Sequence, residues 1–123
     1  MVHVLLIEDD PLVQDMLQVA LQLAGYEVTL ASNGREGLRK FAAQKPDIVV
    51  TDIIMPEQEG IETILAIRKI DQALPIIAMS GGSSIGALDF LDAARTFGAS
   101  RILTKPFSPK DLIAALKDCL IAH

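Results

Sequence analysis

Acidic side chains stand directly after two apolar runs of this sequence. The stretch LLIEDDP places Glu8, Asp9 and Asp10 behind a run that begins at Val4, and Asp52 closes the run DIVVTD. Carboxylates that share one site repel one another, so such a cluster is stable chiefly around a divalent cation. Oxygen ligands without His or Cys suit Mg²⁺ or Mn²⁺ rather than zinc. If the two runs are neighbouring strands, Glu8, Asp9 and Asp52 form a candidate metal site.

A hydroxyl and an ammonium group follow two later apolar runs. Ser80 ends the run PIIAMS, and Lys105 follows the run RILT. Together they suit a phosphoryl group carried on a carboxylate, because the ammonium neutralises charge and the hydroxyl donates a hydrogen bond. With a cation on the remaining oxygens, Asp52 is a candidate nucleophile toward a phosphoryl donor, and the product is an acyl phosphate.

Short β-rich runs alternate along the chain with longer stretches of helical period, which is typical of repeated βα units. The expected strands are 3–8, 27–31, 47–52, 75–80 and 101–104, and the expected helices are 10–25, 35–44, 60–70, much of 84–97, and a last helix that opens at 108–111. Five units are too few for an eight-fold barrel. We predict an α/β, doubly wound, flavodoxin-like three-layer sandwich with parallel strand order 2-1-3-4-5, whose sites lie beyond the carboxyl ends of the strands.

Turn and cap residues support these boundaries. Asp10 is a candidate cap before Pro11 at the first turn of the helix over 10–25, and Gly25 suits its C-terminal left-handed position. In the last helix Ser108 is the expected cap, with Asp111 three residues later. The last helix is expected to bury Leu112, Leu116 and Leu120, and in the first helix an apolar set falls on one helical face: Val13, Leu17, Ala20, Leu21 and Ala24.

Length and composition narrow the class of protein. The chain has 123 residues, which is one ordinary domain, and 11 basic against 16 acidic residues give a net charge of −5. Without a Lys/Arg cluster, a nucleic-acid partner is not expected. The apolar runs are far shorter than a membrane span, and nothing before Val4 resembles a signal sequence, so we expect no membrane association and a cytoplasmic location.

Two residue types with possible site chemistry are better explained by structure. Cys119, the single cysteine, cannot form an internal disulfide and is expected to pack in the core. His3 and His123 have no ligand spacing around them and are expected at an edge or a terminus.

Taken together, Glu8, Asp9, Asp52 in VVTDIIMP, Ser80 and Lys105-Pro106-Phe107 resemble the full constellation of a response-regulator receiver domain, similar to the stand-alone CheY-like regulators. The resemblance covers residues 1–123 as one receiver domain with no output domain. It implies that Asp52 is the phosphoacceptor, that Asp9 binds the metal directly and Glu8 through water, and that the backbone carbonyl of Ile54 completes the protein ligands. Lys105 and Ser80 then bind the phosphate, and the bond from Lys105 to Pro106 is cis.

The resemblance also implies partners. The chain is expected to take a phosphoryl group from a sensor histidine kinase or a histidine phosphotransfer protein and to signal by contact with a downstream protein. It is not expected to be an enzyme beyond its own phosphorylation and dephosphorylation. The contact face is expected around the fourth helix, fifth strand and fifth helix, with Leu88, Ala99 and Ile102, and a homodimer through that face is an open prediction.

Two features depart from many family members. Ile102 stands where an aromatic residue is common, so the signal is expected to move through Ser80 and the following loop, with apolar side chains repacking. Ile54 and Gly82 stand two positions after Asp52 and Ser80, and neither offers a polar group to orient an attacking water. We therefore predict slow self-dephosphorylation.

Three alternatives stay open at this point. A phosphohydrolase of the haloacid dehalogenase class also uses an aspartate nucleophile with Mg²⁺, but its second aspartate is replaced here by Ile54. A flavodoxin-type FMN site is disfavoured, because acids occupy the loop that would bind the flavin phosphate. The third is a receiver-like scaffold that is never phosphorylated.

Overall fold

A computed structural model of the chain describes residues 1–53, 59–80 and 98–121. Its strands are β1 (His3–Ile7), β2 (Glu27–Ala31), β3 (Ile48–Asp52), β4 (Ile76–Ser80) and β5 (Arg101–Thr104), and its helices are α1 (Pro11–Leu23), α2 (Gly34–Ala43), α3 (Glu59–Ile70) and α5 (Pro109–Ile121). Each follows the boundaries predicted from sequence within a few residues. The helix expected over 84–97 lies outside the described residues.

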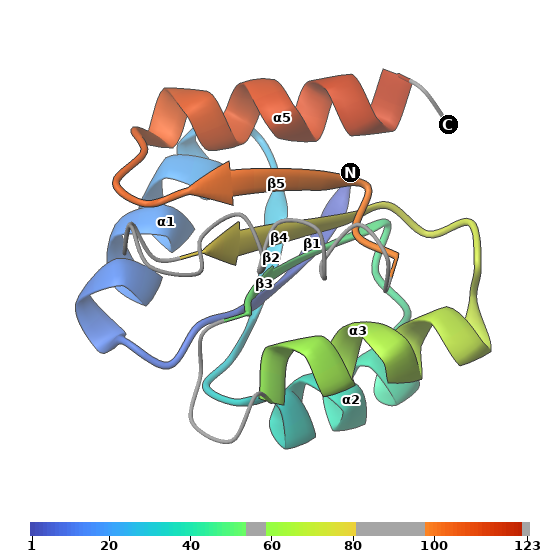
Figure 1. Cartoon of the computed structure of the whole chain (residues 1–123). Coiled ribbons are helices and arrows are strands. Elements are labelled where there is room, and N and C mark those ends of the chain that lie inside the picture. The colour runs from blue at the N-terminus through green and yellow to red at the C-terminus, as the bar shows by residue number, and fades with distance from the viewer. Residues whose placement is uncertain (54–58, 81–97, 122–123) are drawn as a thin grey trace.

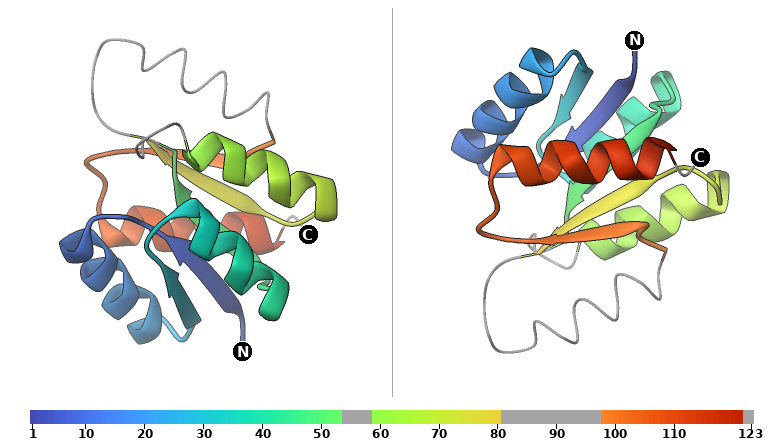
Figure 2. Two further views of the ribbon diagram at one scale, coloured as in Figure 1. Left: turned by 90° about the horizontal axis from the view of Figure 1, so that it is seen from below. Right: turned by 90° about the horizontal axis from the view of Figure 1, so that it is seen from above.

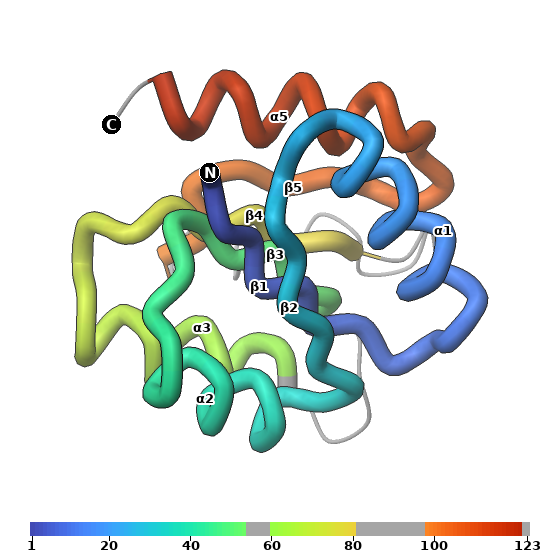
Figure 3. Tube along the Cα trace, turned by 180° about the vertical axis from the view of Figure 1, so that it is seen from behind, coloured from blue at the N-terminus to red at the C-terminus, as the bar shows by residue number. Residues whose placement is uncertain are grey.

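The strands form one parallel sheet in the order β2-β1-β3-β4-β5. Helices α1 and α5 lie against one face, and α2 and α3 lie against the other (Figures 1 and 2). The Cα trace seen from behind shows the same three layers (Figure 3). The predicted doubly wound sandwich and its strand order are therefore confirmed.

The core has two halves, one on each face of the sheet. Strands β1, β3 and β4 are buried along their whole length, because helices cover both of their faces. The half beneath α2 and α3 includes Phe41, Ile64 and Ile67. The half beneath α1 and α5 includes Leu17 and Leu116, and it also holds Cys119, as expected of a packing residue.

The predicted caps of the first helix are present. The side chain of Asp10 accepts a hydrogen bond from the backbone N–H of Leu12 at 2.9 Å, and Pro11 opens α1. Gly25 follows the helix with a φ of +94°, a conformation that favours glycine. Ala24, expected on the apolar face of this helix, lies just outside it and is exposed, because α1 ends at Leu23.

The last helix opens with a reciprocal capping box. The hydroxyl of Ser108 accepts from the backbone N–H of Asp111 at 3.3 Å, and the carboxylate of Asp111 accepts from the N–H of Ser108 at 3.0 Å. This arrangement fixes where α5 begins, at Pro109, four residues after Lys105.

The expectation that His3 lies at an edge is wrong. Its side chain is buried, and its Nε2 lies 2.6 Å from the Thr29 hydroxyl. The reason is the strand order: β1 lies between β2 and β3, so its first residue is already covered. Among the described helices, none has the length and apolar character needed to cross a membrane.

Candidate functional site

The parallel sheet brings the polar ends of four strands to one edge. Asp52 and Ser80 are the last residues of β3 and β4, whereas Glu8 and Lys105 directly follow β1 and β5. The register places these ends level, since Asp52 pairs with Met79 and Ser80 pairs with Thr104. We call this the carboxyl edge of the sheet.

Three carboxylates meet at the carboxyl edge. Glu8, Asp9 and Asp52 each offer an oxygen, and these oxygens lie within 4.8 Å of one another. Glu8 is 1% exposed and Asp52 is 4% exposed, whereas Asp9 faces solvent. Burial raises the pKa of Glu8 above its usual value, and the nearby Asp52 adds to this effect, although a hydrogen bond from Lys105 works against it. Negative charge at this edge is therefore only partly neutralised.

The ammonium group of Lys105 bridges two of these acids. Its Nζ lies 2.9 Å from Glu8 Oε1 and 2.9 Å from Asp52 Oδ2. Burial acts to lower the pKa of Lys105, but the hydrogen bonds to Glu8 and Asp52 outweigh it, so the pKa is raised. Lys105 is thus a fixed cation beside the Asp52 carboxylate. The bond between Lys105 and Pro106 is cis, as the family resemblance implied.

The hydroxyl of Ser80 lies at the same edge and has no hydrogen-bond partner among the described residues. Ser80 is 1% exposed, and among the described residues its Oγ and the Nδ1 of His3 are the buried side-chain polar atoms that lack a partner. A buried hydroxyl without a hydrogen bond is unfavourable by about 1 to 3 kcal/mol. Ser80 is therefore available to an oxygen that enters the site.

Two residues that the sequence analysis did not assign hold this edge in place. Gln14 donates from Nε2 to the backbone carbonyls of Glu8 and Ala31, at 3.2 and 3.3 Å. The sequence did hold a signal for this role, because Gln14 is a polar residue on the inner side of a largely apolar helix. At Gly60, a Cβ atom would lie 2.3 Å from the carbonyl oxygen of Asp52, so α3 begins against the end of β3 and only glycine fits.

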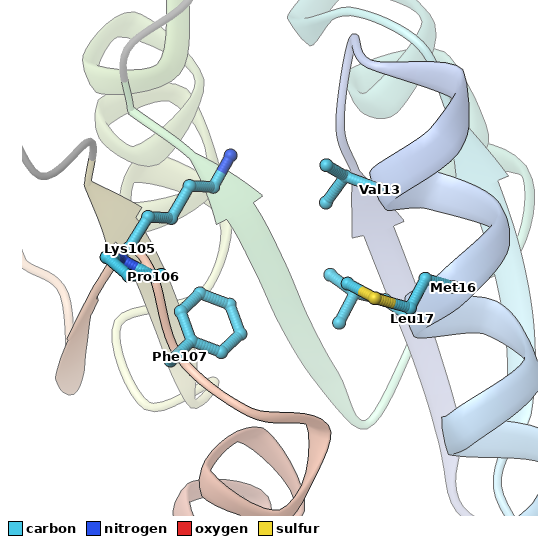
Figure 4. Close-up of a pocket in the computed structure, with 6 residues that line it drawn as sticks. All are labelled: Val13, Met16, Leu17, Lys105, Pro106 and Phe107. Atoms are coloured by element: carbon cyan, nitrogen blue, oxygen red, sulfur yellow. The ribbon is translucent and has the colours of Figure 1, made fainter.

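A small apolar pocket lies next to Lys105. Its volume is about 230 Å³, and Figure 4 shows its lining, in which the side chains of α1 face the segment that joins β5 to α5. The lining residues are Val13, Met16, Leu17, Lys105, Pro106 and Phe107. The sequence analysis did not identify this pocket, because its two walls are far apart in the chain.

The remaining predicted residues have different outcomes. Ile54, the expected carbonyl ligand, and Leu88, on the expected contact face, lie outside the described residues. Ala99 and Ile102 are half-buried and pack against the core half beneath α2 and α3. Asp10 serves as the cap of α1, and its backbone N–H donates to Glu8 Oε2 at 3.1 Å.

The donor set fits a hard divalent cation. Among the described residues, three carboxylates and one lysine lie at this edge, so these side chains together carry an excess of negative charge in a largely buried place. Oxygen donors of this kind suit Mg²⁺ or Mn²⁺. Glu8, Asp9 and Asp52 are therefore the described side chains that could hold such an ion.

Comparison with known proteins decides the family. The model of the response regulator receiver domain matches residues 4–117, which is nearly the whole chain. The chain belongs to the response-regulator receiver family. The role of this family is two-component phosphorelay signalling, and this receiver carries the family's acidic cluster at the carboxyl edge.

Individual relatives agree with the family match. The receiver is 40% identical to the chemotaxis protein CheY of Thermotoga maritima, over 93% of each chain. Its structure resembles that of the chemotaxis protein CheY4 of Vibrio cholerae, with a TM-score of 0.89, 31% identity, and 98% and 99% of the two chains covered. It also resembles the response regulator TrrA of Thermotoga maritima in complex with Mg(2+)-BeF, with a TM-score of 0.84, 32% identity, and 98% and 100% covered.

Several other relatives are longer than this receiver. Mycobacterial transcriptional regulatory proteins match it at 33% to 37% identity, and the chain spans about half of their length, 45% to 49%. The receiver is therefore similar to one part of these proteins and to the whole of the chemotaxis regulators.

Proposed function

We propose that Asp52 accepts a phosphoryl group from a phosphohistidine on a sensor histidine kinase or a phosphotransfer protein, and that the phosphorylated chain signals by protein contact. One observation carries the proposal. Lys105 joins Asp52 and Glu8 at 2.9 Å each, while the buried hydroxyl of Ser80 lacks a described partner at the same edge. A carboxylate, a cation and an unused hydrogen-bond donor meet there.

The proposed chemistry is a transfer between two nucleophiles. A carboxylate oxygen of Asp52 attacks the phosphorus, the bond from phosphorus to the donor's imidazole nitrogen breaks, and the electron pair returns to that nitrogen. The product is an acyl phosphate on Asp52. Lys105 then shifts its hydrogen bond from the carboxylate to a phosphoryl oxygen, and Ser80 donates its O–H to another.

In the proposed site Glu8, Asp9 and Asp52 hold Mg²⁺, or Mn²⁺, and the backbone carbonyl of Ile54 is the further ligand. When bound, the ion supplies positive charge to the phosphoryl oxygens as negative charge develops on them. The distances among the three carboxylates support this assignment, as does the similarity to TrrA, whose structure contains Mg(2+)-BeF.

We propose a phosphoacceptor rather than an enzyme with turnover. Ile54 supplies no acid or base two positions after Asp52, and Gly82 supplies none after Ser80, so loss of the phosphoryl group should be slow. The substitution Ile54→Asn should shorten the lifetime of the phosphorylated state. A lifetime of seconds in the original chain, without a phosphatase, would contradict this part of the proposal.

The proposed output is contact with a downstream protein, at the face that includes Ile102, Ala99 and Leu88. Ile102 and Ala99 are half-buried against the core, so a change at the carboxyl edge can reach them by repacking. A homodimer through that face stays a prediction, as do the cytoplasmic location and the absence of a nucleic-acid partner.

The test is the intact mass of the protein after incubation with acetyl phosphate, with and without Mg²⁺. We expect a gain of one phosphoryl group that requires Mg²⁺ and is lost in Asp52→Asn. The matched control is Asp47→Asn, which changes an aspartate at the opposite end of the sheet and should keep the gain. An equal gain in Asp52→Asn would refute the assignment, and no gain in the folded original chain would favour the unphosphorylated scaffold.

A further inference from the structure

Helix α1 exposes a row of large apolar side chains to solvent. The exposed fractions of Leu12, Met16, Val19 and Leu23 are 80%, 49%, 54% and 84%. Among the described residues, seven large apolar side chains are at least 49% exposed, and these four of them lie on one helix of 13 residues. A contiguous apolar patch of this kind is uncommon on a monomer and marks an interaction site.

The spacing of these residues forms a narrow stripe. Successive members are four, three and four positions apart, so at about 100° per residue they fall within about 60° around the helix. The buried residues of α1, Leu17 and Leu21, lie on the opposite side of the helix. Helix α1 is therefore apolar on two opposite faces, and a helix of this kind is normally covered on both.

The order of the residues in the stripe is symmetric about the middle of α1. Leu12 and Leu23 stand equally far from the midpoint between Leu17 and Gln18, and so do Met16 and Val19. If two copies of α1 pack antiparallel about a two-fold axis at that midpoint, Leu12 meets Leu23 of the second copy and Met16 meets Val19. Such an isologous contact uses the same surface on both copies.

We propose that this stripe is an interface between two copies of the chain, formed by antiparallel packing of their α1 helices. Charge favours this occupant. The only charged residue of α1 is Asp15, and its polar residues are otherwise the neutral Gln14, Gln18 and Gln22. In the symmetric register Asp15 lies opposite Ala20 of the second copy, so a chain with a net charge of −5 meets itself without opposing carboxylates.

The position of α1 allows this contact. The helix lies at the periphery of the molecule, beside the edge strand β2 (Figures 2 and 3), although Met16 of the stripe also lines the pocket next to Lys105. The proposed interface differs from the face that contains Ala99 and Ile102. The two can therefore be separated by mutation.

The size of the stripe sets the expected strength. A helix of 13 residues is about 20 Å long, and one pair of such helices buries less than the roughly 800 Å² per partner of a standard stable interface. We expect weak, reversible dimers with a dissociation constant of roughly 10 µM to 1 mM.

The first test is sedimentation equilibrium over this concentration range. We expect the original chain to dimerise and Val19→Glu to raise the dissociation constant at least about tenfold, because two carboxylates then lie beside the axis. The control Ile70→Glu alters a comparably exposed apolar residue on α3 and should leave the dissociation constant unchanged. Circular dichroism verifies that both variants fold. A monomer at about 1 mM, or equal dimerisation of Val19→Glu, would overturn the proposal.

The second test determines the register by disulfide formation. Chains with Leu12→Cys and chains with Leu23→Cys are mixed and mildly oxidised, and the original chain controls for the buried Cys119. Antiparallel packing predicts that mixed disulfides between the two variants outnumber disulfides within either variant. A preference for like-with-like pairs would indicate parallel packing and would overturn the proposed geometry.

Discussion

The two ends of the sheet use polar residues in opposite ways. At the carboxyl edge, two of the three described carboxylates share Lys105, and the hydroxyl of Ser80 has no described partner. At the amino end, which we call the amino edge, a single arginine is matched by several acceptors. Arg68 donates to the carbonyls of Gly98, Leu74 and Asp71 at 2.8, 2.6 and 3.2 Å, and to the Ser100 hydroxyl at 3.4 Å.

We interpret this difference as a division between an amino edge that serves stability and a carboxyl edge that serves the proposed chemistry. Arg68 ties the end of α3 to the segments before β4 and β5, and Asp71 beside it accepts from two backbone N–H groups and pairs with Lys45. Within the described part of the chain, the Nδ1 of His3 at this end lacks a hydrogen-bond partner. Unmatched charge is unfavourable for folding, so its concentration beside Asp52 is consistent with a site that receives a charged group.

The largest expected effect is at Gly60, where one substitution should change both the stability of the fold and the phosphorylation of Asp52. In Gly60→Ala the new Cβ collides with the Asp52 backbone, so we expect a loss of roughly 3 kcal/mol in the free energy of unfolding and a slower phosphorylation of Asp52. Urea unfolding and acetyl phosphate labelling measure the two effects. Gly25→Ala is the control: it has no atom within 4 Å of the new Cβ and should cost about 1 kcal/mol, without slowing the labelling. Normal stability in Gly60→Ala would contradict the close approach of α3 to β3.

At the amino edge, Arg68→Ala should reduce stability without changing chemistry. Losing the hydrogen bonds of a half-buried guanidinium should lower the free energy of unfolding by about 2 to 4 kcal/mol, while the folded protein is labelled at the original rate. Arg101→Ala removes an exposed pair with Asp118 and should change stability by less than about 1 kcal/mol. Slow phosphorylation of folded Arg68→Ala would contradict the claim that the amino edge contributes to stability alone.

At the carboxyl edge, Mg²⁺ should stabilise the fold through the acids that repel one another. At ten times its dissociation constant the ion should add about 1.4 kcal/mol to the free energy of unfolding. Asp9→Asn should lose most of this gain and, without Mg²⁺, should be no less stable than the original chain, since one repelling charge is gone. Asp15→Asn, an exposed change on α1, should keep the gain. Mg²⁺ stabilisation of equal size in Asp9→Asn would remove that residue from the site.

The smallest effect is a pH dependence at Asp71. The ion-pairing hydrogen bond with Lys45, together with the backbone N–H groups of Ala73 and Leu74, lowers the pKa of Asp71 from its usual 3.8. A lowered pKa contributes stability that is present above 3.8 and is lost as the pH falls through the folded value. Asp71→Asn should therefore lose less stability than the original chain on acidification below pH 4, and Lys45→Met should show part of the same change. Parallel pH profiles of urea unfolding would contradict this.

Much of the fold was predictable because local signals and the global arrangement agree. Alternating apolar runs predicted the described strands, and Asp10, Gly25 and Ser108 marked helix ends by chemistry that acts within a few residues. The convergence of Glu8, Asp52, Ser80 and Lys105 followed from the rule that parallel strands end at one edge.

The missed features depend on contacts between segments far apart in the chain. Nothing next to Gly60 in the sequence indicates that a carbonyl group of β3 lies against it. Likewise, the sequence around Arg68 is that of an ordinary helix and does not indicate the contact with the segment before β5. His3 was misassigned although the predicted strand order already placed its strand between two others. The exposed stripe of α1 was missed because the buried face of the same helix seemed sufficient to explain why the helix is rich in apolar residues.

The central claim is that the carboxyl edge is a phosphoacceptor site centred on Asp52. The most direct test is to phosphorylate the protein with Mg²⁺ and acetyl phosphate, reduce the acyl phosphate with borohydride, and locate the reduced residue by peptide mass spectrometry. Reduction converts a phosphorylated aspartate to homoserine. The account predicts homoserine at position 52 and not at Asp9 or Asp10. Homoserine at another acid, or none in a protein that has gained a phosphoryl group, would contradict it.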